Sequence, residues 1–371
     1  QNIGAGRPGV AYQARQLGLA FNAVLGIILS LILAFGAGTI LAGVGVADAL
    51  MQPARTYLQI VGGFCILNAL IPICSSYLRA FGFSKEPLYA SIIGNVINFC
   101  LNAFFLFVLH KGVAGVATAT VVSRIINLVI VVLLGAVLVK AKKHPERESN
   151  REVMGQIIRI GLPSACETAI YNVSMTLVIR FLNQMDAQGL NVTARSYTMQ
   201  ITNFSYCVGA ALAQANAIMT GWRIGAKEYD ACDRGTRKAA IIGVIVAVIL
   251  ETMFALCSGW IMQLFSKDPQ MVSLVGKLLA IDIVLEMGRV TNLVYGQALK
   301  TSGDAVFPVV MGACFMILCS VGGTYLFGIR LGLLAVGAYI GMAGDECVRA
   351  IGMYLRWKSG KWKQKGLVKS R

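Results

Sequence analysis

Long apolar runs alternate with short polar breaks along the whole chain. Each run is close to the roughly 20 residues that a helix needs to cross about 30 Å of hydrocarbon. None of the breaks is long enough to fold as a soluble domain. The pattern therefore predicts an all-α integral membrane protein with about ten spans, centred near Leu31, Leu67, Asn98, Asn127, Val173, Val208, Val248, Glu286, Ile317 and Gly344.

The composition indicates the same class and argues against an enzyme. Hydrophobic residues make up 57% of the chain and charged residues only 13%, whereas soluble domains carry about 25% charged residues. Most of the 10 cysteines lie inside apolar runs without metal-ligand spacing, and the 2 histidines, His110 and His144, lie in breaks. We therefore expect no cofactor and no metal centre. A receptor or scaffold would need a sizeable soluble module, and a membrane enzyme would need reactive polar residues clustered at one interface.

Basic residues gather in alternate breaks, around residues 7–15, 79–85, 140–159, 223–238 and 300 and in the tail 356–371. Cytoplasmic loops of membrane proteins hold the excess of Lys and Arg. This asymmetry predicts that both ends of the chain are cytoplasmic, and we expect a monomer in the cytoplasmic (inner) membrane of a prokaryote. The net charge of +16 thus follows from topology. A nucleic-acid partner is not expected, because it would need basic residues gathered on one soluble module.

The chain also contains two related halves. The first contains YLRAFGFSKEPLYASIIGNVINFCLNAFFLF followed by GVAGVATATVVSRII, and the second contains YGQALKTSGDAVFPVVMGACFMILCSVGGTYLF followed by GLLAVGAYIGMAGDECVRAI. Each half has a helix that ends in a basic turn with glycine, a span entered near proline and a glycine-rich start of a last helix, which carries Arg124 or Arg349. The spans near Val173 and Val208 have no counterparts in the first half. We therefore expect an amino-terminally truncated fragment that lacks two helices of a six-plus-six parent.

An even number of spans separates matching positions, so the halves are expected to share one orientation in the membrane, as parallel repeats do. We predict two lobes: residues 1–145, without the first two helices, and residues 146–371, with six spans and a basic tail. Transporters built from such repeats bind substrate between their lobes and alternate access by rocking them. The symmetry alone therefore indicates a transporter.

One span carries Asp282, Glu286, Arg289 and Asn292. Charged groups at bilayer depth cost several kcal/mol unless they face a partner or a watery cavity. The spacing of Asp282, Glu286 and Arg289 places them on one helix face. Two buried carboxylates cannot both ionise cheaply, so one is expected to hold a proton or a cation. Alternatively, Glu286 and Arg289 only neutralise each other and fix packing, and Asp282 is simply hydrated near the outer surface.

Glu167 is a further candidate, because it follows Pro163 closely. Proline can break a helix, and freed carbonyls near Pro163 would form a cation site together with Glu167, Tyr171 and Asn172. The alternative is a carboxylate that snorkels at the helix entry.

Two more polar residues lie deep in apolar spans. Glu251 has no basic neighbour at helical spacing, so we expect it to face Arg289 or Arg349 on another helix. Gln297 is expected to form an interhelical hydrogen bond or to line a cavity.

Five segments resemble, in the same order, segments of the multidrug and toxic compound extrusion (MATE) family. They are QNIGAGRPGVAYQARQLG (1–18), RIGLPSACETAIYNVS (159–174), ALAQANAIMTGWRIGAKEY (211–229), EMGRVTNLVYGQALKTSGDAVFP (286–308) and RAIGMYLRWKSGKWK (349–363). No single segment is a catalytic fingerprint, but together and in this order they are specific, and the resemblance covers essentially the whole chain.

The resemblance implies two bundles of six helices, a large central cavity, and export of bulky organic cations in exchange for protons (H⁺) or sodium ions (Na⁺). It also implies that carboxylates of the second lobe bind the coupling ion: Glu167, Glu286 and Asp282, with Na⁺ at Glu167 or Glu286 if sodium is the ion. The alternative is a lipid-linked oligosaccharide flippase of the same superfamily, which would need more basic residues in its cavity. The residues expected to line or support the site are Arg289, Asn292, Tyr171, Asn172, Gln297 and Glu251.

Overall fold

The computed structural model describes residues 1–44, 47–139, 146–186 and 189–367, and these residues form helices and no strand. All ten predicted segments lie on helices, so the all-α prediction is confirmed. Lys140, Lys142, Lys143 and His144 lie outside the described residues, as does the predicted lobe boundary at residue 145.

The long helical stretches follow the predicted spans. They are α1 (Pro8–Phe35), α3 (Asp48–Tyr57) with η1 (Leu58–Gly62) and α4 (Ile66–Ala80), α5 (Lys85–Ala103) with η2 (Phe104–Val108), α6 (Gly112–Leu138), α7 (Asn150–Met185), α8 (Leu190–Gly225), α9 (Tyr229–Leu256), α11 (Pro269–Ser302), α12 (Val306–Phe315) with η4 (Met316–Val321) and η5 (Thr324–Arg330), and α13 (Leu334–Lys358). Short helices connect some of them: α2 (Ala37–Val44), α10 (Ser258–Met262) and η6 (Lys361–Gln364).

Within the described residues, 5 helices are long and apolar enough to cross a membrane: α1, α5 with η2, α6, α9, and α12 with η4 and η5. The stretch from α3 to α4, which is bent by 41°, would be the next. The other long helices, α7, α8, α11 and α13, are less apolar. These four helices carry most of the side chains that line the cavity described below.

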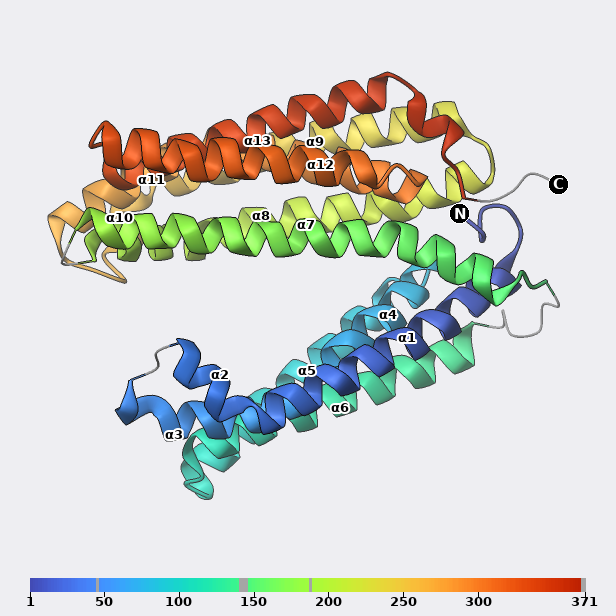
Figure 1. Cartoon of the computed structure of the whole chain (residues 1–371), viewed down its shortest axis with the longest axis horizontal. Coiled ribbons are helices and arrows are strands. Elements are labelled where there is room, and N and C mark those ends of the chain that lie inside the picture. Colours follow the sequence, from blue (N-terminus) through green and yellow to red (C-terminus); the bar gives the residue numbers. More distant parts are fainter. Residues whose placement is uncertain (45–46, 140–145, 187–188, 368–371) are drawn as a thin grey trace. The chain divides into compact units, whose positions relative to one another are not determined.

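The chain divides into two compact units (Figure 1). The N unit comprises Arg7–Ile157, and the C unit comprises Gln1–Gly6 and Ile158–Arg371. The division lies inside α7. Gln1 belongs to the C unit because its side-chain amide donates to the carbonyl of Thr301 at 2.6 Å and accepts from the amide of Leu367 at 2.8 Å.

The N unit is a bundle in which α1 packs on α4, and both α4 and α5 pack on α6. Its core consists of the buried residues Cys74, Tyr77, Leu78, Ala90, Val131 and Val139. The side chains that face away from this core are large and apolar, as on α1 and α5, which suits contact with lipid.

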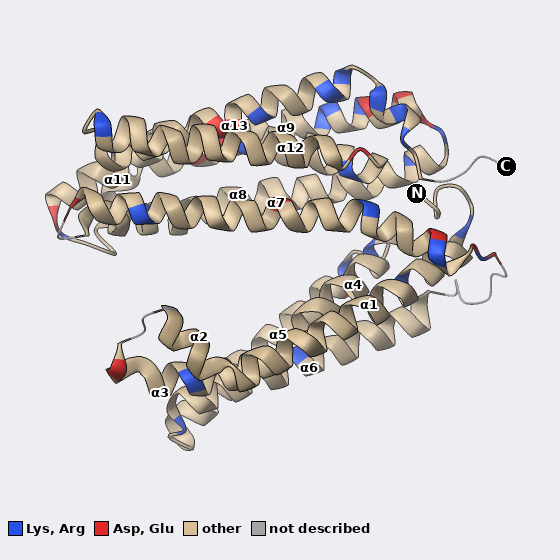
Figure 2. Ribbon diagram, viewed as in Figure 1, with Lys and Arg blue, Asp and Glu red and all other residues tan. Residues whose placement is uncertain are grey.

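In the C unit, α11 is the central helix and packs on α8, α9 and α13. It contributes to two cores, one around Leu278 and Leu285 and the other around Val294 and Tyr295. Lys and Arg of this unit gather mainly at the helix ends near its carboxyl terminus, and few charged residues lie along the helix middles (Figure 2).

The two halves end corresponding helices with the same turn. At the end of α11, Gly303 has a φ of 97°, its amide donates to Lys300, and the next amide, that of Asp304, donates to Leu299 at 2.9 Å. At the end of α4, Gly82 (φ 91°) and its successor form the same pair of bonds. This is the Schellman arrangement, which favours glycine because of its positive φ.

The turns before the last helix of each half also correspond. The amides of Leu109 and Lys111 in the N unit donate back to η2, and those of Leu331 and Leu333 donate back to η5 in the same pattern. This repeated geometry supports the predicted internal symmetry of the chain.

The turns also fix which residues of α6 and α13 are equivalent. Asp345, Glu346 and Arg349 on α13 take the positions that α6 fills with Ser123, Arg124 and Asn127. A polar contact is kept at one of these positions: Asn98 donates to Ser123 at 3.3 Å, and Ser320 donates to Asp345 at 2.9 Å. Arg124 and Arg349 are therefore not equivalent to each other.

Candidate functional site

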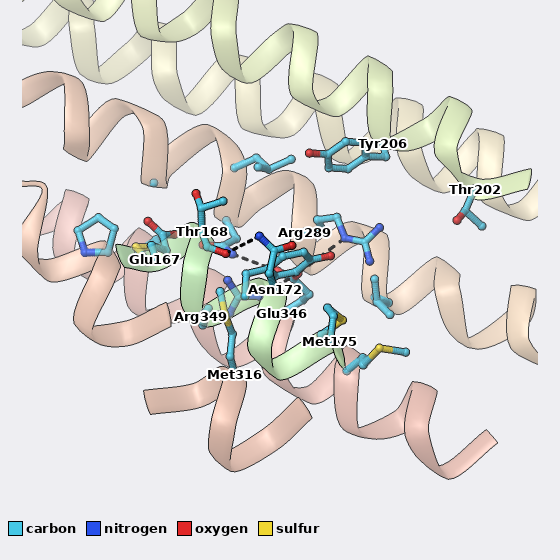
Figure 3. A pocket seen from close by; sticks show the side chains of 18 of the residues that line it. Glu167, Thr168, Asn172, Met175, Thr202, Tyr206, Arg289, Met316, Glu346 and Arg349 are labelled. Carbon is cyan, nitrogen blue, oxygen red and sulfur yellow. Dashed lines mark hydrogen bonds and ion pairs between the residues drawn. The ribbon is translucent and has the colours of Figure 1, made fainter. Parts of the chain in front are cut away.

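The C unit contains a cavity of about 650 Å³ between α7, α8, α11, α12 and α13 (Figure 3). Methionines form part of its apolar lining, and methionine adapts readily to ligands of different shape. They are Met175, Met199, Met316, Met342 and Met353. The charged side chains of the lining are Glu167, Arg195, Asp282, Arg289, Lys300, Glu346 and Arg349.

Arg289 connects two carboxylates that come from different helices. Its Nη1 lies 2.7 Å from Oε2 of Glu286 on the same helix, and its Nε lies 3.7 Å from Oε1 of Glu346 on α13. The side-chain amide of Asn292 donates to Oε2 of Glu346 at 3.0 Å. Glu286 is fully buried behind the cavity, whereas Glu346 lines it.

Arg349 extends this network along α13. Its guanidinium lies 2.8 Å from both Asp345 and Glu346. It also lies near Glu167 of α7. The network therefore runs from buried Glu286 through Arg289 and Glu346 to Arg349.

A glycine brings the helices that carry this network together. A Cβ added to Gly288 of α11 would lie 2.8 Å from the backbone of both Glu346 and Cys347 on α13. Only a residue without a side chain permits this approach without a shift, so Gly288 helps to set the distance between Arg289 and Glu346.

Three acidic side chains near Arg289 keep carboxyl oxygens without a donor in hydrogen-bonding geometry in the described part of the chain, although the hydroxyl of Ser205 lies near Glu251. They are both oxygens of Glu251, Oδ2 of Asp282 and Oε1 of Glu286. Exposure of these residues is 0%, 2% and 0%. Glu251 has Asp282, Glu286 and Arg289 as charged neighbours, so of the two arginines considered for it, Arg289 is the one nearby. Ionised carboxylates in such a place are costly, and protonation or a bound cation would relieve that cost.

Glu167 pairs with Lys300 of α11 at 2.6 Å. The expected break at Pro163 is wrong, because α7 runs without interruption from Asn150 to Met185. A single proline removes one backbone hydrogen bond, here the one to the carbonyl of Arg159, and the helix continues past it. The freed carbonyls that were expected to complete a cation site are therefore not provided by an open helix.

The cavity brings together most of the residues singled out from the sequence. Its lining includes Glu167, Tyr171, Asn172, Asp282, Arg289, Asn292 and Gln297. Glu251 and Glu286 lie behind the lining and are fully buried. The residues singled out from the sequence do not include Arg195, Lys300, Asp345 and Glu346.

The sequence does contain a pattern that points to the functional residues on α13. Asp345, Glu346 and Arg349 are three charges in an otherwise apolar span, which is the pattern that drew attention to α11. Lys300 was assigned only to a basic break, and nothing in the local sequence pairs it with Glu167.

Two comparisons of the sequence decide the family. The sequence profile of the MatE family matches residues 1–104 and 163–326. The uncharacterized transporter YisQ of Bacillus subtilis (strain 168) is 32% identical to this chain over 99% of the chain and 82% of its own length. The chain belongs to the MatE family. It is therefore a membrane transporter and not an enzyme.

Other proteins similar to this chain are more distant in sequence. The probable multidrug resistance protein NorM of Thermotoga maritima is 23% identical over 85% of this chain and 68% of its own length. An outward-facing multidrug resistance MATE family transporter of the MOP superfamily has the same fold, with a TM-score of 0.87 at 18% identity, over 98% of this chain and 82% of its own. A MOP superfamily transporter from Pyrococcus furiosus has the same TM-score of 0.87, over 100% and 82% of the two chains.

The two halves of this MatE protein differ in charge at equivalent positions. The helix α13 carries Asp345, Glu346 and Arg349, where α6 carries two neutral residues and Arg124. The acidic network is thus a feature of the C unit and not of the repeat itself.

Proposed function

We propose that this transporter exports bulky organic cations in exchange for H⁺ or Na⁺, by alternating access between the lobes 1–145 and 146–371. The cavity has a volume suited to drug-sized molecules, about 650 Å³. Its methionine-rich lining and the carboxylate of Glu346 suit apolar molecules that carry a positive charge. Multidrug resistance proteins among the relatives support the same substrate class.

The observation that carries the coupling proposal is the group of buried carboxyl oxygens without donors in hydrogen-bonding geometry on Glu251, Asp282 and Glu286. A proton or Na⁺ that enters this group neutralises a charge that is otherwise costly to bury. Glu286 is the central member, because it also contacts Arg289.

Arg289 links ion binding to substrate binding in this proposal. While Arg289 pairs with Glu286 at 2.7 Å, its contact with Glu346 is long, 3.7 Å. Arg349 lies 2.8 Å from Glu346 but is shared with Asp345, so Glu346 keeps part of its negative charge and can attract a cationic substrate. When Glu286 takes up an ion, Arg289 loses its closer partner and moves toward Glu346. The cation and Arg289 then compete for one carboxylate, so ion entry favours substrate release.

Glu167 is the second proposed coupling carboxylate. Its pair with Lys300 already neutralises it. An ion would therefore bind at Glu167 only when Lys300 moves away, and we expect its replacement to change flux less than replacement of Glu286 does.

We also propose that the protein lies in the cytoplasmic membrane as a monomer, with both ends of the chain in the cytoplasm. The basic helix ends near the carboxyl terminus of the C unit support this orientation (Figure 2). The cavity lining comes from one unit of one chain, so no second copy is needed to complete it.

The test is dye flux from proteoliposomes of the full-length protein, with a pH gradient and a sodium gradient imposed separately. We expect one gradient to drive flux of a cationic dye, and Glu286→Gln to lower that flux about tenfold or more, a typical coupling energy. The matched control is Glu228→Gln, because Glu228 is exposed next to α9 and lies outside the cavity lining.

Unchanged flux in Glu286→Gln would refute the coupling assignment. No dye flux under either gradient, from protein with a normal melting curve, would refute the exporter itself and make the lipid-linked oligosaccharide flippase the next function to test.

A further inference from the structure

Arg195 differs from the other cationic side chains of the cavity. In the described part of the chain, Arg289, Lys300 and Arg349 each lie within 4.0 Å of a carboxylate. Arg195 has no such ion pair among the described residues. Its Nη2 contacts Sδ of Met175 at 3.8 Å, a weak acceptor, and its buried Nε has no hydrogen-bond partner there.

Arg195 is not an ordinary surface arginine. It lies in the second turn of α8, is only 7% exposed, and lines the cavity. An arginine that snorkels to water keeps its head exposed. A buried guanidinium stays charged, because arginine does not lose its proton in proteins, and burial of a charge without a counter-charge is costly.

Arg195 also begins a polar stripe on α8. Thr202, Asn203 and Tyr206 follow it at helical spacing and line the same cavity, and the ring of Tyr206 lies 5.9 Å from the guanidinium of Arg289. Tyr339 of α13 lies near Arg195 as well. A substrate in the cavity would therefore meet both a cation without an ion pair in the described chain, with hydrogen-bonding groups beside it, and the carboxylate of Glu346.

We propose that Arg195 binds a carboxylate of the substrate, so that the cavity prefers zwitterionic amphipathic molecules to molecules that carry only a positive charge. The guanidinium matches a carboxylate in geometry, because two of its N–H groups can donate to the two oxygens in parallel. This inference deepens the proposed function and rests on it in one respect, that the cavity is the substrate site.

The experiment measures binding and not transport. Tetramethylrhodamine, which carries a free carboxylate, and its methyl ester, which does not, are titrated into the detergent-solubilised full-length protein, and fluorescence polarisation is recorded. We expect the acid to bind more tightly than the ester. Arg195→Gln is expected to weaken binding of the acid about tenfold to a hundredfold, as loss of charge-assisted hydrogen bonds does, and to leave binding of the ester within about twofold.

Two further variants sharpen the test. Arg195→Lys keeps the charge but loses the paired donors, so it should recover only part of the preference for the acid. Arg180→Gln is the control, because Arg180 is an exposed arginine of α7 outside the cavity lining. This variant should change the affinity for neither dye. Each dye is titrated separately into the same preparation, and the dissociation constants are compared. Partial unfolding lowers the amount of protein that binds either dye and changes neither dissociation constant.

The proposal is wrong if Arg195→Gln leaves the ratio of the two dissociation constants unchanged, whether or not binding of both dyes weakens. It is also wrong if the wild type binds the ester at least as well as the acid. The outcome is separate from that of the flux test. If Arg195→Gln loses the preference for the acid but the wild type shows no gradient-driven flux, the anion site is supported and the coupled exporter is rejected.

Discussion

Buried acidic residues in this protein differ in the hydrogen bonds and ion pairs that their neighbours supply. Asp304, in the turn after α11, is 1% exposed at its side chain and contacts Arg356 at 2.7 Å and Lys365 at 2.6 Å. Glu251 is equally buried, but its oxygens have no donor in hydrogen-bonding geometry in the described chain. The first arrangement is expected to stabilise the fold, and the second is suited to taking up an ion.

Replacement of Asp304 should therefore lower stability in a pH-dependent way. Burial alone would raise the pKa of Asp304, but the hydrogen bonds and charges of Arg356 and Lys365 outweigh it and hold the pKa below its ordinary value. Because the folded pKa is the lower one, this stabilisation is complete above the unfolded pKa of about 4 and is lost as the pH falls through the folded pKa. We expect Asp304→Asn to cost about 2 kcal/mol near pH 7 and less near pH 3.

Melting curves of the detergent-solubilised protein across this pH range would check the prediction. Asp230→Asn is the control. Asp230 is 87% exposed at its side chain and its contact with Lys363 is long, 4.0 Å, and such surface pairs contribute little to stability. If the difference in melting temperature between wild type and Asp304→Asn does not become smaller at low pH, the prediction is wrong.

At the scale of helices, the packing of α11 on α13 depends on Gly288. A Cβ at this position would lie 2.8 Å from the backbone of α13, so Gly288→Ala should push the helices apart and weaken the contact between Arg289 and Glu346. Overpacking outweighs the better helix propensity of alanine, and we expect a loss of about 1–2 kcal/mol together with reduced flux. Gly344→Ala is the control on α13, because a Cβ there meets nothing within 4 Å. A variant Gly288→Ala with the stability and flux of the control would show that the close approach is not required.

Helix positions and the residues on one helix face could be predicted from the sequence, because both depend on local patterns. Each of the ten predicted spans has its centre on a helix, and spacing alone placed Asp282, Glu286 and Arg289 on one face of α11. The partners across helices, such as Lys300 for Glu167, could not be predicted. They depend on which faces meet, and no local pattern records that.

At the scale of the whole molecule, the two halves share their turns but not their chemistry. Asp345 and Ser123 occupy equivalent positions, and each accepts a hydrogen bond from the preceding helix of its half, at 2.9 and 3.3 Å. Only Asp345 also pairs with an arginine, Arg349. If coupling belongs to the C unit, Asp345→Asn should lower gradient-driven dye flux about tenfold, whereas Ser123→Ala should change it less than about twofold. Dye binding without a gradient, measured on the same two variants, separates loss of coupling from loss of substrate affinity. Equal losses of flux at the two positions would mean that both halves take part in coupling, and the assignment to the C unit would then be wrong.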